Sequence, residues 1–94
     1  MAEFHHLGAY LKQKRTDAGY TQVELAEKLG DIHSQFVSNW ERGLCAPPGH
    51  SLPRLVDILK LSRERLVEVM VQDSRAGIMA KIYKKKAKSN KKTA

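Results

Sequence analysis

The fold of this chain is decided by residues 21–43, which read Thr-Gln-Val-Glu-Leu-Ala-Glu-Lys-Leu-Gly-Asp-Ile-His-Ser-Gln-Phe-Val-Ser-Asn-Trp-Glu-Arg-Gly. The pattern predicts two short helices joined by a tight turn. Thr21 is a favourable N-cap for the first helix, and Glu24 three residues later completes a capping box. Leu25 and Leu29 lie four residues apart and therefore share one apolar face. Gly30 is expected to end this helix, because glycine adopts a positive φ without steric cost.

The second helix of the pair is expected to begin near His33 or Ser34 and to end at Gly43. Its apolar side is marked by Phe36, Val37 and Trp40. Its other side is formed by four short polar residues, Ser34, Gln35, Ser38 and Asn39. Hydroxyl and carboxamide groups both donate and accept hydrogen bonds, and they can read base edges in a DNA major groove. From the residues alone, this side is either a base-reading surface or a solvated face.

The order of these residues resembles the lambda-repressor/Cro-like (XRE-type) helix-turn-helix DNA-binding family. The matching positions are Thr21-Gln22, Leu25-Ala26, Gly30, Val37-Ser38 and Glu41-Arg42-Gly43. The resemblance extends from about Leu7 to Leu66 and implies an all-α domain of five helices. It also implies sequence-specific binding of double-stranded DNA by a dimeric transcriptional regulator, with the helix from His33 to Arg42 in the major groove.

The resemblance implies two kinds of contact with DNA. Base edges would be contacted by the polar side of the second helix, namely Ser34, Gln35, Ser38 and Asn39. The resemblance implies that Gln22, at the start of the first helix of the pair, holds a phosphate, and Arg42 and His33 are further candidates for phosphate contact. Phe36 would either touch a thymine methyl group or pack inside the domain, and both alternatives stay open at this point.

The resemblance also bears on how the second helix is held. It implies that Arg15 pairs with Glu41 and joins the first helix of the chain to the end of the recognition helix. The alternative is a solvated arginine near a helix C-terminus, where a cation interacts favourably with the helix dipole. The family has one residue between its glycine and the cap of the second helix, whereas here both Asp31 and Ile32 precede His33. This insertion is expected to tilt or translate the second helix.

The composition of the chain restricts the class of protein to which it can belong. The chain has 94 residues, of which 41% are hydrophobic, and this suits one small domain with extensions. The sequence has no apolar run of membrane-spanning length, and its first six residues lack the layout of a signal peptide. The single Cys45 excludes an internal disulfide. We therefore expect a cytoplasmic, nucleoid-associated protein that does not enter a membrane.

The sequence offers no pattern for metal, cofactor or catalytic chemistry. The adjacent His5 and His6 would point about 100° apart on a helix and would not share a metal ion. The spacing of Cys45 and the four histidines fits no zinc site. A nucleophile–base pair and a phosphate-binding loop are both missing from the sequence. We expect no enzyme activity, no cofactor and no metal.

The net charge of +7 is located at the C-terminus. Residues 81–94 contain seven lysines and no acidic residue, which leaves ten basic and ten acidic residues in the rest of the chain. Long-range attraction to a polyanion would therefore come from this tail. We expect residues 84–94 to be disordered, either as a solubilising end or as a flexible cation that binds phosphates without sequence preference.

Two more helices are expected between the motif and the tail. One begins at Ser51 as its N-cap, with Pro53 in the first turn. The next begins at Ser62, again an N-cap, and ends near Gln72.

The helix that begins at Ser62 has two apolar sides. Leu66, Val69 and Met70 suit the core, whereas Val67 and Val71 form a strip on a second side. The strip would be covered by a second subunit or by residues 73–83, which carry Ile78, Met79, Ile82 and Tyr83 and would form a sixth helix.

We therefore divide the chain into a DNA-binding domain (1–72), a segment for dimer or partner contact (73–83) and a basic tail (84–94). The preferred function is DNA binding as a homodimer. The alternative is an antitoxin or adaptor that binds a protein partner through its C-terminal segment.

Overall fold

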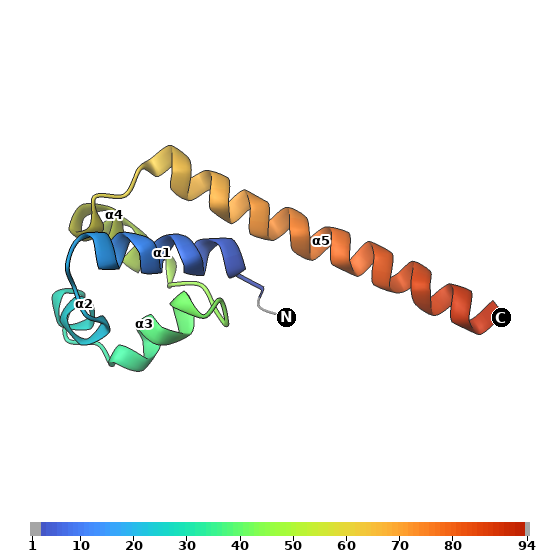
Figure 1. Ribbon diagram of the computed structural model, residues 1–94, viewed down its shortest axis with the longest axis horizontal. Helices are drawn as coiled ribbons and strands as arrows, with labels where there is room; N and C mark the ends of the chain where they lie inside the picture. Colours follow the sequence, from blue (N-terminus) through green and yellow to red (C-terminus); the bar gives the residue numbers. More distant parts are fainter. Residues whose placement is uncertain (1–2, 94) are drawn as a thin grey trace.

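The computed structural model describes the backbone of residues 3–93 and the side chains of residues 3–83. This part of the chain forms five α-helices and no strand, which confirms the predicted all-α class. The helices are α1 (His5–Asp17), α2 (Gln22–Lys28), α3 (Ser34–Glu41), α4 (Leu52–Leu59) and α5 (Arg63–Thr93), and a short 3-10 turn, η1 (Gly49–Ser51), precedes α4. The pair α2 and α3 is the predicted two-helix unit (Figure 1).

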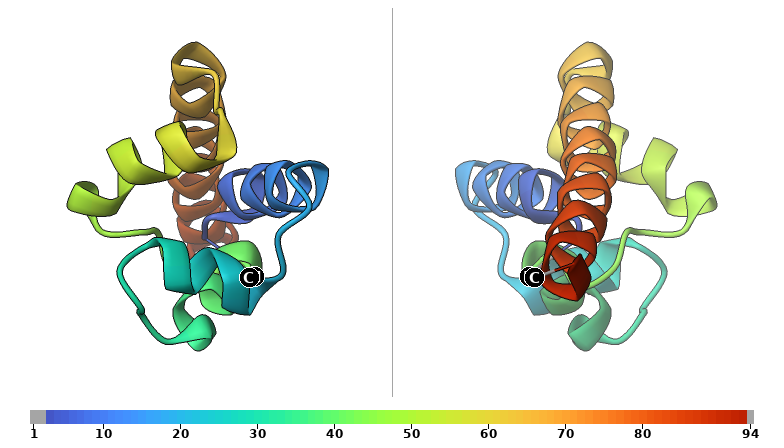
Figure 2. Two further views of the ribbon diagram at one scale, coloured as in Figure 1. Left: turned by 90° about the vertical axis from the view of Figure 1, so that its left-hand side faces the viewer. Right: turned by 90° about the vertical axis from the view of Figure 1, so that its right-hand side faces the viewer.

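Helix α1 lies between the two-helix unit and α5. It packs against α3 and against the first half of α5, while α2 packs against α3. In the two views of Figure 2, α1 and α4 lie on opposite sides of α5, and α2 and α3 lie below them. The largest side chains with less than 2% exposure come from the first four helices, one from each, and are Leu7, Leu25, Val37 and Leu55. Burying a side chain of this size stabilises a fold by about 1.5–3 kcal/mol, so this core holds the short helices in place.

The predicted capping box of α2 is confirmed. The Thr21 hydroxyl accepts a hydrogen bond from the Glu24 backbone N–H at 3.0 Å, and the Glu24 carboxylate accepts one from the Thr21 N–H at 2.8 Å. The hydrogen bond that the carboxylate accepts from the Thr21 backbone is the largest cause that lowers the pKa of Glu24, and the Thr21 side chain acts in the same direction. Because α2 has only seven residues, satisfying its free N–H groups matters more than its intrinsic propensity.

Helices α1 and α3 cross in close contact at Gly8. A Cβ atom at this position would lie 2.6 Å from the carbonyl oxygens of both Trp40 and Glu41. These oxygens belong to the backbone of the last turn of α3 and cannot rotate away. The crossing therefore requires glycine inside α1, although glycine in a helix interior costs about 0.5–1 kcal/mol relative to alanine.

We predict that Gly8→Ala lowers the free energy of unfolding by about 1–3 kcal/mol, because the added methyl group forces the two backbones apart. Gly77→Ala is the matched control, since Gly77 lies in α5 with no atom within 4 Å of the added group. It should stabilise the protein by roughly 0.5–1 kcal/mol. Urea denaturation followed by circular dichroism measures both changes. Stabilisation by both substitutions would show that the close crossing is not needed.

Helix α5 is longer than the sequence indicated. It continues from Arg63 to Thr93, so the predicted end near Gln72 is wrong and residues 73–83 do not form a separate sixth helix. Residues 73–83 include no proline, and several of them are good helix formers. Helix α5 also includes residues 84–93, where we expected disorder. The side chains of residues 84–94 lie outside the described residues. Within the described chain, no helix is long and apolar enough to cross a membrane.

The first half of α5 is fixed to the start of α1 by Asp73. This carboxylate is 5% exposed and accepts hydrogen bonds from the backbone N–H groups of His6 at 2.8 Å and Leu7 at 2.9 Å. The N-cap residue of α1, Phe4, makes no side-chain capping bond. Asp73 therefore supplies from another helix the capping group and the negative charge that a helix N-terminus favours.

We predict that Asp73→Ala destabilises the protein by about 1–3 kcal/mol, because it leaves two backbone donors at the start of α1 without their acceptor. Asp73→Asn keeps one acceptor oxygen and should lose less. Ser74→Ala, at the exposed neighbouring position, is the control and should change little. Thermal melts of the three variants test this order, and equal melting temperatures for Asp73→Ala and Ser74→Ala would contradict it.

The two other predicted N-caps differ from each other. The Ser62 hydroxyl accepts a hydrogen bond from the Arg65 N–H at 3.2 Å, which confirms the predicted cap of α5. Ser51 is the N-cap residue of α4 and Pro53 lies in the first turn, as predicted, but Ser51 is buried, ends η1 and makes no side-chain capping bond. Its backbone already has helical angles, φ −85° and ψ −19°, whereas a capping residue normally has an extended backbone.

Candidate nucleic-acid interface

The Arg15 guanidinium group holds the end of α3 in position. Its Nε donates to one carboxylate oxygen of Glu41 at 2.5 Å, and a terminal nitrogen donates to the other oxygen at 3.0 Å. The second terminal nitrogen donates to the Tyr20 carbonyl at 2.7 Å. Both charged side chains are largely buried, at 11% and 3% exposure. The bond to Glu41 raises the pKa of Arg15. The structure therefore brings together, in a bidentate geometry, the two residues that the resemblance paired.

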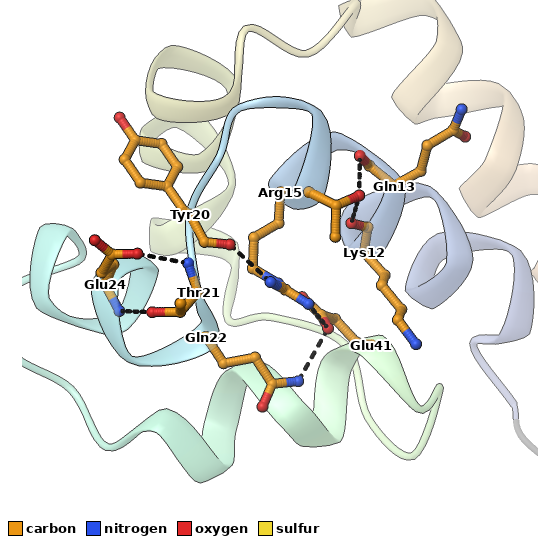
Figure 3. A network of polar contacts seen from close by, with 9 residues as sticks. Lys12, Gln13, Arg15, Tyr20, Thr21, Gln22, Glu24 and Glu41 are labelled. Atoms are coloured by element: carbon orange, nitrogen blue, oxygen red, sulfur yellow. Dashed lines mark hydrogen bonds and ion pairs between the residues drawn. The ribbon is translucent and has the colours of Figure 1, made fainter.

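Glu41 also binds α2 through Gln22. The Gln22 carboxamide nitrogen donates to a Glu41 oxygen at 3.0 Å (Figure 3). Gln22 is one of the residues expected to contact phosphate, and the structure directs one of its two amide hydrogens to the protein interior instead. Its other amide hydrogen and its position at the start of α2 leave it able to meet a phosphate as well.

The extra turn residue is accommodated by two consecutive left-handed residues. Gly30 has φ +99° and Asp31 has φ +58°. The Asp31 N–H donates to the Glu27 carbonyl at 3.1 Å, and the Ile32 N–H donates to the Ala26 carbonyl at 3.2 Å. Aspartate is among the few residues that tolerate this conformation. The turn thus closes on α2 and returns the chain to the core, against which Ile32 packs.

His33 is the N-cap of α3, at the position the sequence indicated. Its ring Nδ1 accepts a hydrogen bond from the Gln35 backbone N–H at 3.1 Å. An accepting Nδ1 carries no proton, so the neutral ring has its proton on Nε2. His33 is exposed, and this N–H is a donor at the N-terminal end of α3.

The outer side of α3 displays the residues expected to contact DNA. Gln35 and Arg42 are exposed, whereas Ser34, Ser38 and Asn39 are half-buried. The Gln35 carboxamide nitrogen donates to the Asn39 side-chain oxygen at 3.0 Å, across one turn of the helix. The base-contact candidates therefore include a pair of carboxamides joined to each other on the surface.

Phe36 differs from the rest of the expected apolar side of α3. Val37 and Trp40 are 1% and 3% exposed, but Phe36 is 53% exposed and is not part of the core. This outcome removes the alternative in which Phe36 packs inside the domain. The sequence pattern placed Phe36 on the apolar side of α3, because it directly precedes the buried Val37. Phe36 also lies three positions before Asn39, and in the structure it shares the outer side of the helix with that residue.

Among the described residues, no group of three or more His, Cys, Asp or Glu side chains is arranged to hold a metal ion. The interface offers hydrogen-bonding groups, one exposed aromatic ring and one exposed cation, which suit recognition of another molecule by contact.

The profile of the Helix-turn-helix family matches residues 11–66, more than half of the chain, and the chain belongs to this family. Among curated proteins, it is 41% identical over 61 residues to the HTH-type transcriptional regulator ImmR of Bacillus subtilis (strain 168). The match covers 65% of this chain and 47% of ImmR, so the chain corresponds to about half the length of that relative. A search of solved structures found no significant match.

We predict that Arg15→Ala lowers the free energy of unfolding by about 3 kcal/mol or more, because it leaves the buried Glu41 carboxylate without its cation. Replacing both partners, with Arg15→Met and Glu41→Leu together, should cost less than the single change, since no buried charge remains unpaired. Lys12→Ala, an exposed change on the same helix, is the control. Chemical denaturation decides the point, and a double variant less stable than Arg15→Ala would argue against this account.

Proposed function

We propose that this protein binds double-stranded DNA in a sequence-specific manner through α3 and regulates transcription. The observation that carries the proposal is the arrangement of α3 itself. One side is immobilised by buried Val37 and Trp40 and by the ion pair of Glu41, while the other presents Gln35 and Asn39 to solvent. A helix held in this way can enter a major groove with its polar groups fixed relative to the rest of the domain.

Phosphate contacts would orient α3 in the groove. The candidates lie at its two ends and beside it: the Nε2–H of His33, the Arg42 guanidinium and the second amide hydrogen of Gln22. Contacts of this kind fix register but carry no sequence information. Arg42 caps the C-terminus of α3 and is exposed, so it can reach a phosphate without rearrangement of the core.

We further propose that the protein acts as a homodimer, which would read two half-sites related by two-fold symmetry. Support comes from the strip on α5, where Val67, Val71, Ile78 and Ile82 are 59%, 58%, 55% and 49% exposed. ImmR is named a transcriptional regulator, which agrees with this class of function. The same strip also supports the second candidate, an adaptor or antitoxin whose α5 binds a different protein.

Selection from a random duplex library at physiological salt tests the proposal with the full-length protein. An enriched inverted repeat, with half-sites about 10 base pairs apart or a multiple of that, is the result expected of a dimeric regulator. Enrichment of single half-sites would support DNA reading without a dimer. If no sequence is enriched, the regulator proposal fails, and co-purification of a stoichiometric protein would then favour the adaptor.

We predict that Arg42→Ala weakens binding by a similar factor on all duplexes and reduces the slope of log K against log salt by about 0.9, the value for one lost phosphate contact. Arg63→Ala removes an exposed cation from the start of α5, on the other side of α1 from α3 (Figure 1). This control should leave the slope unchanged. Fluorescence anisotropy titrations at several salt concentrations measure both slopes. An unchanged slope for Arg42→Ala would remove it from the interface.

A further inference from the structure

We propose that the outer side of α3 is built to read adenine·thymine pairs. The Gln35 and Asn39 carboxamides would act as one adenine-reading unit, and the Phe36 ring would contact a thymine methyl group. The inference rests on the proposed DNA binding and concerns only which bases are recognised.

The carboxamide pair presents a defined set of hydrogen-bonding atoms. One Gln35 amide hydrogen is directed to the Asn39 oxygen at 3.0 Å. The Gln35 oxygen then remains an acceptor, and the Asn39 amide nitrogen remains a donor. In the major groove, adenine offers an N6 amino donor beside an N7 acceptor. The pair matches this edge, with the Gln35 oxygen accepting from N6 and the Asn39 nitrogen donating to N7.

The bond between the two side chains also lowers the cost of recognition. Gln35 is an exposed side chain with several rotatable bonds, and ordering such a side chain on binding costs conformational entropy. Here Asn39, one helical turn away, already restrains it. Loss of either carboxamide would therefore impair the other, and the two residues should behave as a unit.

Phe36 would contact the methyl group of a thymine and so extend recognition to the second base of an adenine·thymine pair. Its ring is 53% exposed on a helix whose neighbouring aromatic residue, Trp40, is 3% exposed. Phe36 directly follows Gln35 and precedes Asn39 by three positions, so it borders the carboxamide pair on the helix surface. The thymine C5-methyl group is the apolar feature of the major groove, and aromatic side chains are among those that contact it.

The residues that α3 lacks point in the same direction. Guanine is most often read by Arg or Lys bonded to O6 and N7. Helix α3 reads Ser-Gln-Phe-Val-Ser-Asn-Trp-Glu and contains neither residue. The nearest cation, Arg42, lies beyond the last turn as the C-cap. Carboxamides and an aromatic ring without a basic residue therefore favour adenine and thymine over guanine.

The test uses the full-length protein and synthetic duplexes of its selected operator. Each adenine is replaced in turn by 7-deazaadenine, which lacks the N7 acceptor, and each thymine by uracil, which lacks the methyl group. We expect at least one 7-deazaadenine to weaken binding by about 2–13-fold, the range for one lost hydrogen bond, because the N6 amino group remains. We expect at least one uracil to weaken binding about fourfold, as for one buried methyl group.

Variants assign these effects to residues. The 7-deazaadenine effect should disappear in Gln35→Ala and in Asn39→Ala, and the uracil effect in Phe36→Ala. The double variant of Gln35 and Asn39 should lose about as much affinity as either single variant, because the pair acts as a unit. Gln13→Ala removes an exposed carboxamide from α1 and is the control, with no expected change in affinity.

The outcomes separate this inference from the proposed function. A selected operator that tolerates every 7-deazaadenine and every uracil would overturn the inference while leaving sequence-specific binding intact. Additive losses for Gln35→Ala and Asn39→Ala would overturn the coupled unit. If selection yields no operator, the proposed function itself fails and the inference falls with it.

Discussion

The structure depends on the bidentate pairing of Arg15 with Glu41. Through these two side chains, α1 is joined to the last turn of α3, to the Tyr20 carbonyl before α2, and to Gln22 at the start of α2. Two helices of seven and eight residues are too short to be stable alone in water. Buried charges also demand a defined geometry, since a displaced partner leaves a charge without compensation. The pair therefore fixes the relative positions of α1, α2 and α3 more strictly than apolar packing would.

The fixed positions of these helices matter for the proposed recognition of DNA. Base edges are distinguished by donor and acceptor positions, so the reading side chains must project from a backbone that does not shift. Glu41 belongs to the same helix as Gln35 and Asn39, less than two turns away, and its carboxylate is held by hydrogen bonds from two other segments. The cap by His33 constrains the other end of α3, and the close crossing at Gly8 constrains the same end as Glu41. The polar side of α3 is thus carried on a rigid element.

The sequence was a good guide where structure depends on local chemistry. The capping box of Thr21 and Glu24, the cap by His33 and the end of the helix at Gly30 all follow from residues within a few positions of each other. The meeting of Arg15 with Glu41, 26 residues apart, came from family resemblance and could not be calculated from spacing. Among the candidate interface residues, pattern alone misjudged Phe36, because helical periodicity is ambiguous at the edge of an apolar face.

The features that the sequence did not predict depend on contacts between distant segments. Gly8 carries no local sign that the backbone of α3 will lie against it. Asp73 looks like an ordinary polar residue in a helix, and its role appears only when α1 is placed beside α5. The predicted end of α5 was wrong because residues 73–83 contain nothing that interrupts a helix. An exposed apolar strip does not require the helix to end.

Asp73 also determines how much of the chain is needed for a complete fold. The family match ends at residue 66, and the buried apolar residues that α5 contributes to the core end at Val69. A chain that ended at either residue would lack Asp73, whose carboxylate accepts hydrogen bonds from N–H groups at the start of α1. A fragment cut at either boundary would retain every residue of the helix-turn-helix yet begin to unravel at its N-terminus, on the opposite end of the sequence from the cut. The cooperative unit of this protein is therefore longer than its motif, and its two ends are thermodynamically linked.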